Sequence, residues 1–142
     1  MWSGELTKIN KRKRTQIRQF IITNQRFINF GNRTLKDKFV NLFKGSKVKR
    51  EIGLEKITHI TYSETSSQFI LHVPSEYDYR LRTLDRDDFL LYLICFREKL
   101  KQPLVKIWLR PEINLEAFTK TENMKNTVCP SENPKEFSSK QF

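Results

Sequence analysis

Residues 4–23 read GELTKINKRKRTQIRQFIIT, a run in which two alternating segments flank a cluster of cations. Polar and apolar side chains alternate across residues 2–9 and again across residues 15–23, which is typical of strands with one buried face. The polar residues 10–14 between them favour a turn. The sequence therefore predicts a β-hairpin with a strongly basic tip.

The rest of the chain continues in the same way and then changes period. Five further runs have strand-like composition and turn signals between them: residues 26–31, 48–54, 57–63, 68–73 and 77–83. Residues 84–101 instead carry apolar side chains at helical spacing, and Pro103 follows them. We therefore expect a mainly β fold, a seven-stranded antiparallel open barrel with one amphipathic C-terminal helix over one end. Residues 32–47 predict a short helix or an ordered loop.

Length and composition bound the domain organisation. A chain of 142 residues usually forms one core, and 11 Phe, four Tyr and two Trp exclude disorder throughout. We assign residues 1–101 to the barrel domain, residues 102–118 to a segment that docks on it or binds a partner, and residues 119–142 to a flexible tail. Exposure of Leu104, Trp108 and Leu109 would indicate a protein partner, whereas packing of these side chains over the barrel would leave the basic end as the main functional surface.

Positive charge is concentrated in the first third of the chain. Residues 1–50 hold 14 basic and two acidic side chains, a net charge of +12, whereas the remaining 92 residues have a net charge of −1. This asymmetry predicts an anionic partner. Three kinds of partner fit: phospholipid head groups, nucleic acid, or an acidic protein surface such as a cytoskeletal polymer. A merely solvated basic face is the alternative.

Two stretches resemble a known superfold. Residues 4–23 are similar to the opening strand, basic loop and second strand of pleckstrin-homology domains, and the resemblance covers residues 2–101. Residues 52–63, IGLEKITHITYS, and 68–73, QFILHV, add a similarity to the tail homology 1 domain of class I myosins, a lipid-binding variant of this fold. The resemblance implies that Lys8 and Arg18 hold phosphoinositide head groups. The family's intermediate basic position falls on Gln16.

Strand parity places the same two cations without any family. Lys8 shares its strand face with Leu6, and Arg18 shares its face with Phe20, so both cations are expected to point into the mouth of the barrel. Arginine suits bidentate phosphate contact, so Arg18 is assigned the orienting role and Lys8 a supporting one. Loop cations next to them are expected to reach a membrane plane. The predicted lipid- and anion-binding residues are Lys8, Lys11, Arg12, Lys13, Arg14 and Arg18.

The leading hypothesis is an adaptor or targeting domain that binds phosphoinositide or phosphatidylserine through this hairpin. The alternative is a structural or scaffold protein that uses the barrel and its C-terminal tail to bind an acidic partner, such as a cytoskeletal or ciliary assembly. Nucleic acid is not the expected partner, because Phe20 and Phe30 near the cations are predicted to be core rather than stacking platforms.

An enzyme is not expected. The sequence holds only four Gly and no nucleophile elbow, phosphate-binding glycine loop or HExxH motif. His59 and His72 are predicted to have structural or surface roles, without a metal or cofactor. Acidic residues at 85, 87 and 88 are explained by the start of a helix.

Composition also bears on location. Cys95 and Cys129 have no partner spacing, which favours a reducing compartment. The sequence shows neither a membrane span nor a signal peptide. We therefore expect a cytoplasmic protein associated peripherally with membrane or with the cytoskeleton.

Overall fold

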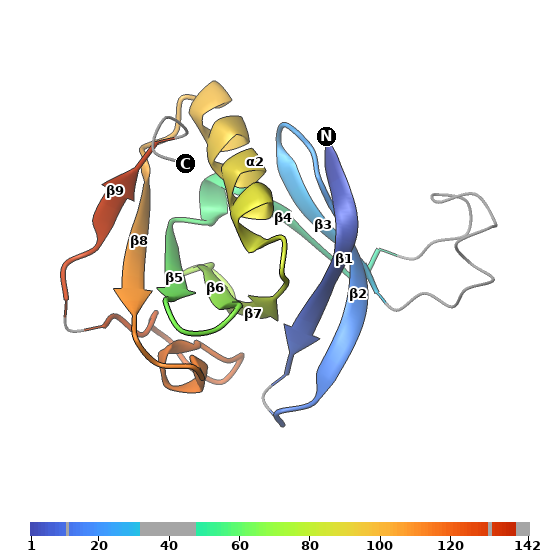
Figure 1. The fold of residues 1–142 in the computed structure, drawn as a ribbon. Coiled ribbons are helices and arrows are strands. Elements are labelled where there is room, and N and C mark those ends of the chain that lie inside the picture. The colour runs from blue at the N-terminus through green and yellow to red at the C-terminus, as the bar shows by residue number, and fades with distance from the viewer. Residues whose placement is uncertain (11, 32–47, 131, 139–142) are drawn as a thin grey trace.

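The expected hairpin forms from strands β1 (Trp2–Ile9) and β2 (Thr15–Ile22), whose register runs from Trp2 opposite Ile22 to Ile9 opposite Thr15. The computed structural model describes residues 1–10, 12–31, 48–130 and 132–138. Across these ranges nine strands form one sheet in the order β4-β3-β2-β1-β7-β6-β5-β8-β9 (Figure 1). Lys11 and the predicted helix or loop over residues 32–47 lie outside the described residues.

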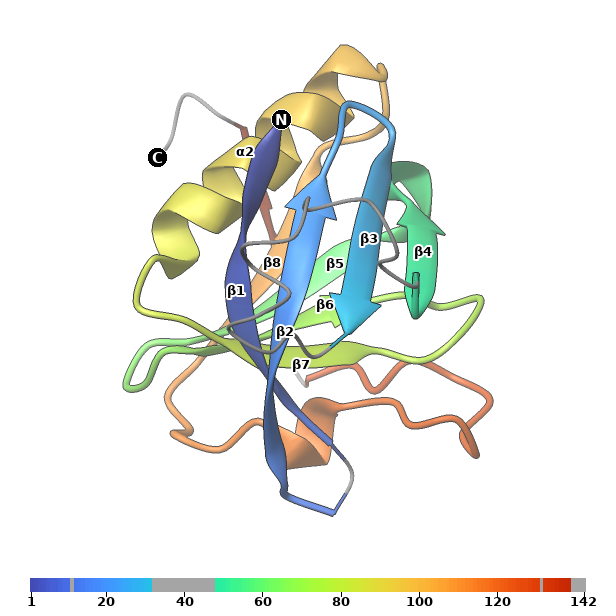
Figure 2. The same cartoon turned by 90° about the vertical axis from the view of Figure 1, so that its right-hand side faces the viewer.

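The strands between the hairpin and the helix follow the predicted order. They are β3 (Arg26–Gly31), β4 (Arg50–Gly53), β5 (His59–Ser63), β6 (Gln68–His72) and β7 (Tyr79–Arg82), with a short 3-10 helix η1 (Leu54–Lys56) after β4. Strand β1 pairs with β2 along its whole length and with β7 only at Thr7 and Lys8, so it joins the two halves of the sheet at its C-terminal end. Figure 2 shows the hairpin of β1 and β2 extending past the other strands at the end away from the helix.

Helix α2 (Arg86–Lys99) covers one end of the bent sheet (Figure 1). Its Phe89, Leu90 and Leu93 are fully buried in the main apolar cluster, in which Phe20 stacks on Phe27 with 4.9 Å between ring centroids. Two carboxylates lie in its first turn and two cations in its last, which matches the helix dipole. The mainly β fold with one covering helix is therefore confirmed.

The predicted count of seven strands is wrong, because two further strands extend the sheet. Strand β8 (Val105–Arg110) pairs in parallel with β5, and β9 (Lys135–Phe137) pairs antiparallel with β8. Val105 and Ile107 point into the core, and Trp108 is buried, with its Nε1–H donating to the carbonyl of Glu132 at 2.8 Å. Burial of these apolar side chains stabilises β8 on the flank of the barrel.

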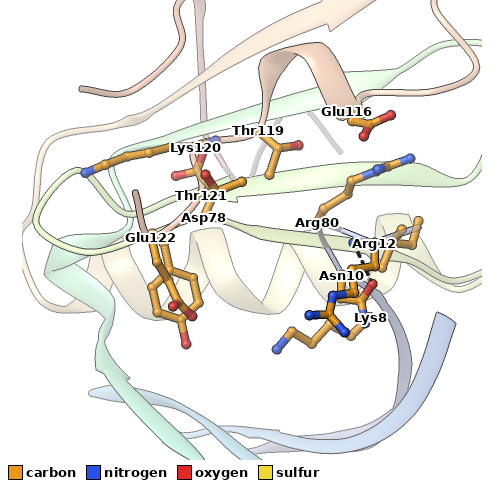
Figure 3. A pocket seen from close by; sticks show the side chains of 12 residues that line it. Lys8, Asn10, Arg12, Asp78, Arg80, Glu116, Thr119, Lys120, Thr121 and Glu122 are labelled. Atoms are coloured by element: carbon orange, nitrogen blue, oxygen red, sulfur yellow. Dashed lines mark hydrogen bonds between the residues drawn. The ribbon is translucent and has the colours of Figure 1, made fainter. Parts of the chain in front are cut away.

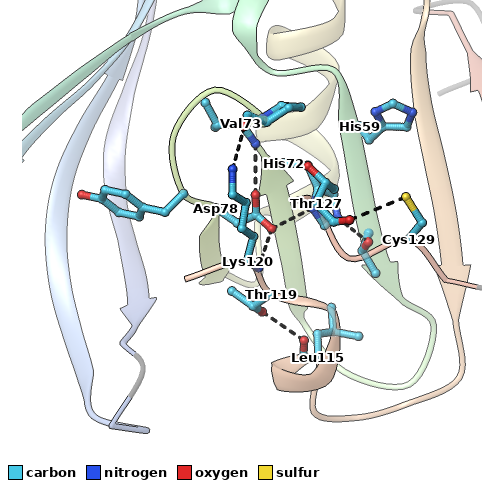
Figure 4. Close-up of polar contacts among 12 residues, drawn as sticks. His59, His72, Val73, Asp78, Leu115, Thr119, Lys120, Thr127 and Cys129 are labelled. Atoms are coloured by element: carbon cyan, nitrogen blue, oxygen red, sulfur yellow. Dashed lines mark hydrogen bonds and ion pairs between the residues drawn. The ribbon is translucent and has the colours of Figure 1, made fainter. Parts of the chain in front are cut away.

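The segment after β8 is fastened to the barrel by a buried polar network (Figure 4). His72 Nδ1 lies 2.9 Å from Asp78 Oδ2, and its Nε2 lies 2.6 Å from Thr61 Oγ1. The Lys120 N–H donates to the same carboxylate at 2.8 Å, and the Val73 N–H donates to its other oxygen at 3.1 Å. Lys120 is therefore held against Asp78, the residue that precedes β7. The division of the chain at residues 101 and 118 stays a prediction.

Candidate functional site

The hairpin tip has a fixed backbone that presents its cations outward. The Asn10 side-chain oxygen accepts hydrogen bonds from the N–H groups of Arg12 and Arg14, each at 2.9 Å, and Lys13 adopts a left-handed backbone with φ 63°. Asparagine commonly organises a turn in this way. Arg12, Lys13 and Arg14 are exposed, so they are available to a surface that approaches the tip.

Behind the tip, two cations lie near one aromatic ring, and the charge of a third acts on one of them. Lys8 Nζ lies 5.6 Å from the centroid of the Tyr79 ring, and the Arg50 guanidinium lies 4.4 Å from the same centroid on β7. Arg18 on β2 belongs to the group, because its charge and that of Arg50 both lower the pKa of Lys8. We refer to Lys8, Arg18 and Arg50 as the cation cluster.

The environment of Lys8 is electrostatically unfavourable for its own charge. Burial is the main cause that lowers the pKa of Lys8 from the ordinary 10.5, and repulsion by Arg18 and Arg50 lowers it further. Glu122 acts in the opposite direction and raises it. An anion placed beside Lys8 would stabilise the protonated amine and relieve this repulsion.

Several donors of the cation cluster make no hydrogen bond among the described residues. Arg18 Nε, Arg50 Nε and Arg50 Nη1 are buried without one, and Arg50 Nε has only a longer ion-pair contact, 3.7 Å from Glu76 Oε1. The other contacts hold the two side chains in place: Arg18 Nη2 donates to Gln16 Oε1 at 2.7 Å, and Arg50 Nη2 donates to the Tyr77 carbonyl at 2.7 Å. Buried donors without partners are costly, and charge-assisted hydrogen bonds to phosphate oxygens would satisfy them.

A pocket of about 330 Å³ opens beside Lys8, between the hairpin and the C-terminal segment (Figure 3). Lys8, Asn10 and Arg12 line one wall. The opposite wall comes from β7 and from residues 116–122, which include the 3-10 helix η2 (Glu116–Phe118). Its volume lies at the lower end of the range usual for small-ligand sites.

The structure brings some of the predicted residues together and separates others. Lys8 and Arg18 meet in the cation cluster, and Arg12 joins Lys8 at the pocket. Lys13 pairs with Glu116 at 3.7 Å, whereas Arg14 stays exposed at the tip. Lys11 lies outside the described residues. The binding role of all six stays a prediction.

Arg50 is the residue that sequence reasoning missed. It stacks on the Tyr77 ring at 3.7 Å and pairs with Glu76 at 3.7 Å, and β4 pairing places it opposite Asn29. Its only signal in the sequence is a basic residue at the start of a short strand, and that signal is shared by many surface arginines.

Other kinds of site find no support in the described ranges. These residues contain no group of three or more side chains able to hold a metal ion. His72 is buried against Asp78, and His59 stacks on Trp108 with 4.7 Å between ring centroids, so both histidines make structural contacts. Within the part of the chain that the structure describes, no helix is long and apolar enough to cross a bilayer.

Comparison with known proteins places the chain in a family. Among solved structures, the solution structure of the PH domain of human oxysterol-binding protein-related protein 11 is similar, with 23% identity over 70% of this chain and 82% of that chain and a TM-score of 0.54. This likeness shows a PH-like fold. No curated protein matches the chain. A family model described as "unconventional myosin tail, actin- and lipid-binding" matches residues 1–141. Because that match spans nearly the whole sequence, the chain belongs to the unconventional myosin tail family of actin- and lipid-binding domains.

Proposed function

We propose that the chain binds anionic phospholipid head groups, phosphoinositide or phosphatidylserine, at the open end of the barrel. The observation that carries this proposal is the cation cluster, in which Arg18 Nε, Arg50 Nε and Arg50 Nη1 are buried without a hydrogen bond among the described residues. Exposed cations of the hairpin tip lie next to it and would touch the membrane plane. The proposed contact residues are Lys8, Lys11, Arg12, Lys13, Arg14 and Arg18, together with Arg50.

The charges are sufficient for reversible association. Each basic residue near an anionic leaflet contributes about 1 kcal/mol, so the six hairpin cations together supply on the order of 5 kcal/mol. Arg18 orients a phosphate because its guanidinium is already fixed by Gln16, and Lys8 adds a point charge. Position 16, which carries a cation in the family that the sequence resembles, holds a glutamine here, and that glutamine orients Arg18.

Vesicle co-sedimentation tests the proposal. Neutral, phosphatidylserine-containing and phosphoinositide-containing vesicles are compared at two salt concentrations for the native chain and for the Lys8→Ala/Arg18→Ala variant. We expect capture by anionic vesicles and a loss of roughly 30-fold in the double variant, the effect of two charges near the leaflet.

A matched control removes two cations at the opposite end of the molecule. Lys56 follows β4 and Lys99 ends α2, and both are exposed. The Lys56→Ala/Lys99→Ala variant has the same net charge as the test variant and should keep native affinity. Equal losses in the two double variants would show that only net charge matters, and no capture by any anionic vesicle would refute lipid binding at this site.

A second candidate function is supported by the family match, whose description includes actin. The same basic end would then bind an acidic surface of a cytoskeletal filament. Trp108 is buried and Leu109 packs against the core, which supports the choice of this end, whereas Leu104 and Ile113 are the large apolar side chains of residues 102–118 that stay exposed. Co-sedimentation with actin filaments, with and without competing anionic vesicles, tests whether one surface serves both partners. Competition supports a shared surface, and simultaneous binding contradicts it.

A further inference from the structure

The pocket beside Lys8 is lined by charges of both signs. Lys8 and Arg12 come from the hairpin and Arg80 comes from β7, whereas the carboxylates of Glu116 and Glu122, which we call the acidic wall, come from the C-terminal segment (Figure 3). Lys120 also lines the pocket, and its Nζ donates to the Pro74 carbonyl. Thr121 adds a side chain between the two carboxylates. A site for phosphate alone has no need of a carboxylate wall, because carboxylates repel phosphate oxygens.

The acidic wall is held in place on both sides of η2. Leu115 is fully buried before it, and the Thr119 hydroxyl donates to the Leu115 carbonyl at 3.0 Å. After it, Lys120 donates through its backbone N–H to Asp78 at 2.8 Å and through Nζ to the Pro74 carbonyl at 2.6 Å (Figure 4). The backbone that carries Glu116 and Glu122 is therefore held against the barrel, and both residues are exposed at the rim of the pocket.

Both carboxylates act on hairpin cations. Glu116 Oε2 lies 3.7 Å from Lys13 Nζ, and the Glu122 charge raises the pKa of Lys8 against the stronger lowering by burial and by Arg18. Positive and negative charges thus face one cavity of about 330 Å³, which is large enough for one small head group.

A ligand that satisfies this arrangement carries charges of both signs. Phosphate oxygens would accept hydrogen bonds from Lys8 and Arg12, and an ammonium group would donate to Glu116 or Glu122. A multiply phosphorylated inositol satisfies only the cationic wall and brings negative charge close to the acidic one. Among anionic phospholipids, phosphatidylserine has the required amine.

We propose that this pocket selects an amine-bearing anionic head group, that of phosphatidylserine, over head groups of equal charge without an amine. The inference rests on the proposed lipid-binding function and specifies which lipid head group the pocket prefers. Glu116 and Glu122 are then specificity-determining residues, and the hairpin cations supply the general attraction.

The test compares phosphatidylserine with phosphatidylglycerol, two lipids of equal net charge of which only the first has an amine. Binding to both vesicles is measured for the native chain, for Glu116→Gln/Glu122→Gln and for Glu51→Gln. Glu51→Gln removes one carboxylate where the test variant removes two, and it serves as the control because Glu51 forms an exposed ion pair with Arg26, 3.2 Å away and outside the pocket. Amide shifts of Thr119 and Thr121 on addition of soluble phosphoserine or glycerol phosphate localise the contact.

We expect the native chain to prefer phosphatidylserine by about fivefold, the effect of one charge contact of about 1 kcal/mol near a leaflet. That preference should disappear in Glu116→Gln/Glu122→Gln and persist in Glu51→Gln. Equal binding of the two lipids by the native chain would overturn the inference and leave lipid binding standing. The inference also fails if the double glutamine variant gains affinity for both lipids with an unchanged ratio, since the carboxylates would then only screen the hairpin. Absence of binding to either lipid would refute both the inference and the proposed function.

Discussion

Arginines at the two ends of the barrel are buried in different ways. At the helix-covered end, Arg97 Nη1 donates to the carbonyls of Leu54, at 2.7 Å, and of Ile57, and its Nη2 donates to that of Pro103 at 3.0 Å. The Nε atoms of Arg97, Arg18 and Arg50 are all buried without a hydrogen bond among the described residues. At the open end, however, Arg18 and Arg50 lie near Lys8, and within the described ranges each donates only one side-chain hydrogen bond, to Gln16 and to the Tyr77 carbonyl respectively. An arginine satisfied by several backbone carbonyls stabilises the fold, whereas arginines that gather with other cations have donors left for an anion.

The largest expected effect follows from removing the satisfied arginine. Arg97→Ala leaves the carbonyls of Leu54, Ile57 and Pro103 without their donor. The free energy of unfolding should therefore fall by about 3 kcal/mol. Chemical denaturation measures this loss, and vesicle affinity of the folded protein should stay unchanged. A loss below about 1 kcal/mol would show that Arg97 is no more important for stability than the arginines at the open end.

At the open end the opposite outcome is expected. Arg50→Met keeps an apolar stem against Tyr77 and Tyr79 and removes the charge. Affinity for anionic vesicles should fall about tenfold, because a charge and its phosphate contacts are lost. The free energy of unfolding should change little, because the loss of the stacked guanidinium is offset by the loss of its repulsion of Lys8. If stability falls and affinity does not, Arg50 is a structural arginine like Arg97.

A third variant adds a cation to the open end of the barrel. Gln16→Lys supplies the basic residue found at this position in the resembling family and removes the acceptor that aims Arg18. We expect about threefold tighter binding to phosphoinositide vesicles, less than the value of a full charge because Arg18 is no longer oriented. Titration against vesicles of graded phosphoinositide content measures it. Weaker binding than native would show that orientation by Gln16 matters more than charge.

A further effect of the cation cluster concerns pH. Because the pKa of Lys8 lies below 10.5, the amine loses its proton at lower pH in the folded protein than in the unfolded chain. Between these two pKa values the unfolded chain binds more protons, so stability rises with pH across that interval. Vesicle affinity should fall there by no more than about fivefold, the value of one charge. Lys8→Arg should abolish the decline, and a decline unchanged in that variant would assign it to another group.

The first three strands and α2 were predictable because their patterns are local. Residues 2–9 and 26–31 match β1 and β3 at both ends, and the helix lies inside the predicted residues 84–101. Strand β8 was missed although Val105, Lys106 and Ile107 alternate, because Trp108 and Leu109 then break the period and its parallel partner β5 is more than 40 positions away. Parallel pairing after a helix leaves no turn signal in the sequence.

The candidate site was only half predictable for the same reason. Lys8 and Arg18 follow from strand parity, since each shares a face with core residues of its own strand. Arg50, Glu116 and Glu122 reach the site through sheet register and through the docking of the C-terminal segment, which depend on contacts distant in sequence. No spacing in the chain connects those residues to the hairpin.

The order of the strands has a consequence for copies that gather on a surface. Strand β9 is the last in the sheet on its side, and it has three residues, of which Lys135 and Glu136 are exposed. Short, charged edge strands resist pairing with a strand of another molecule. Many copies concentrated on one membrane would therefore meet at an edge that discourages fibril-like stacking, and they would remain separate molecules at high local density.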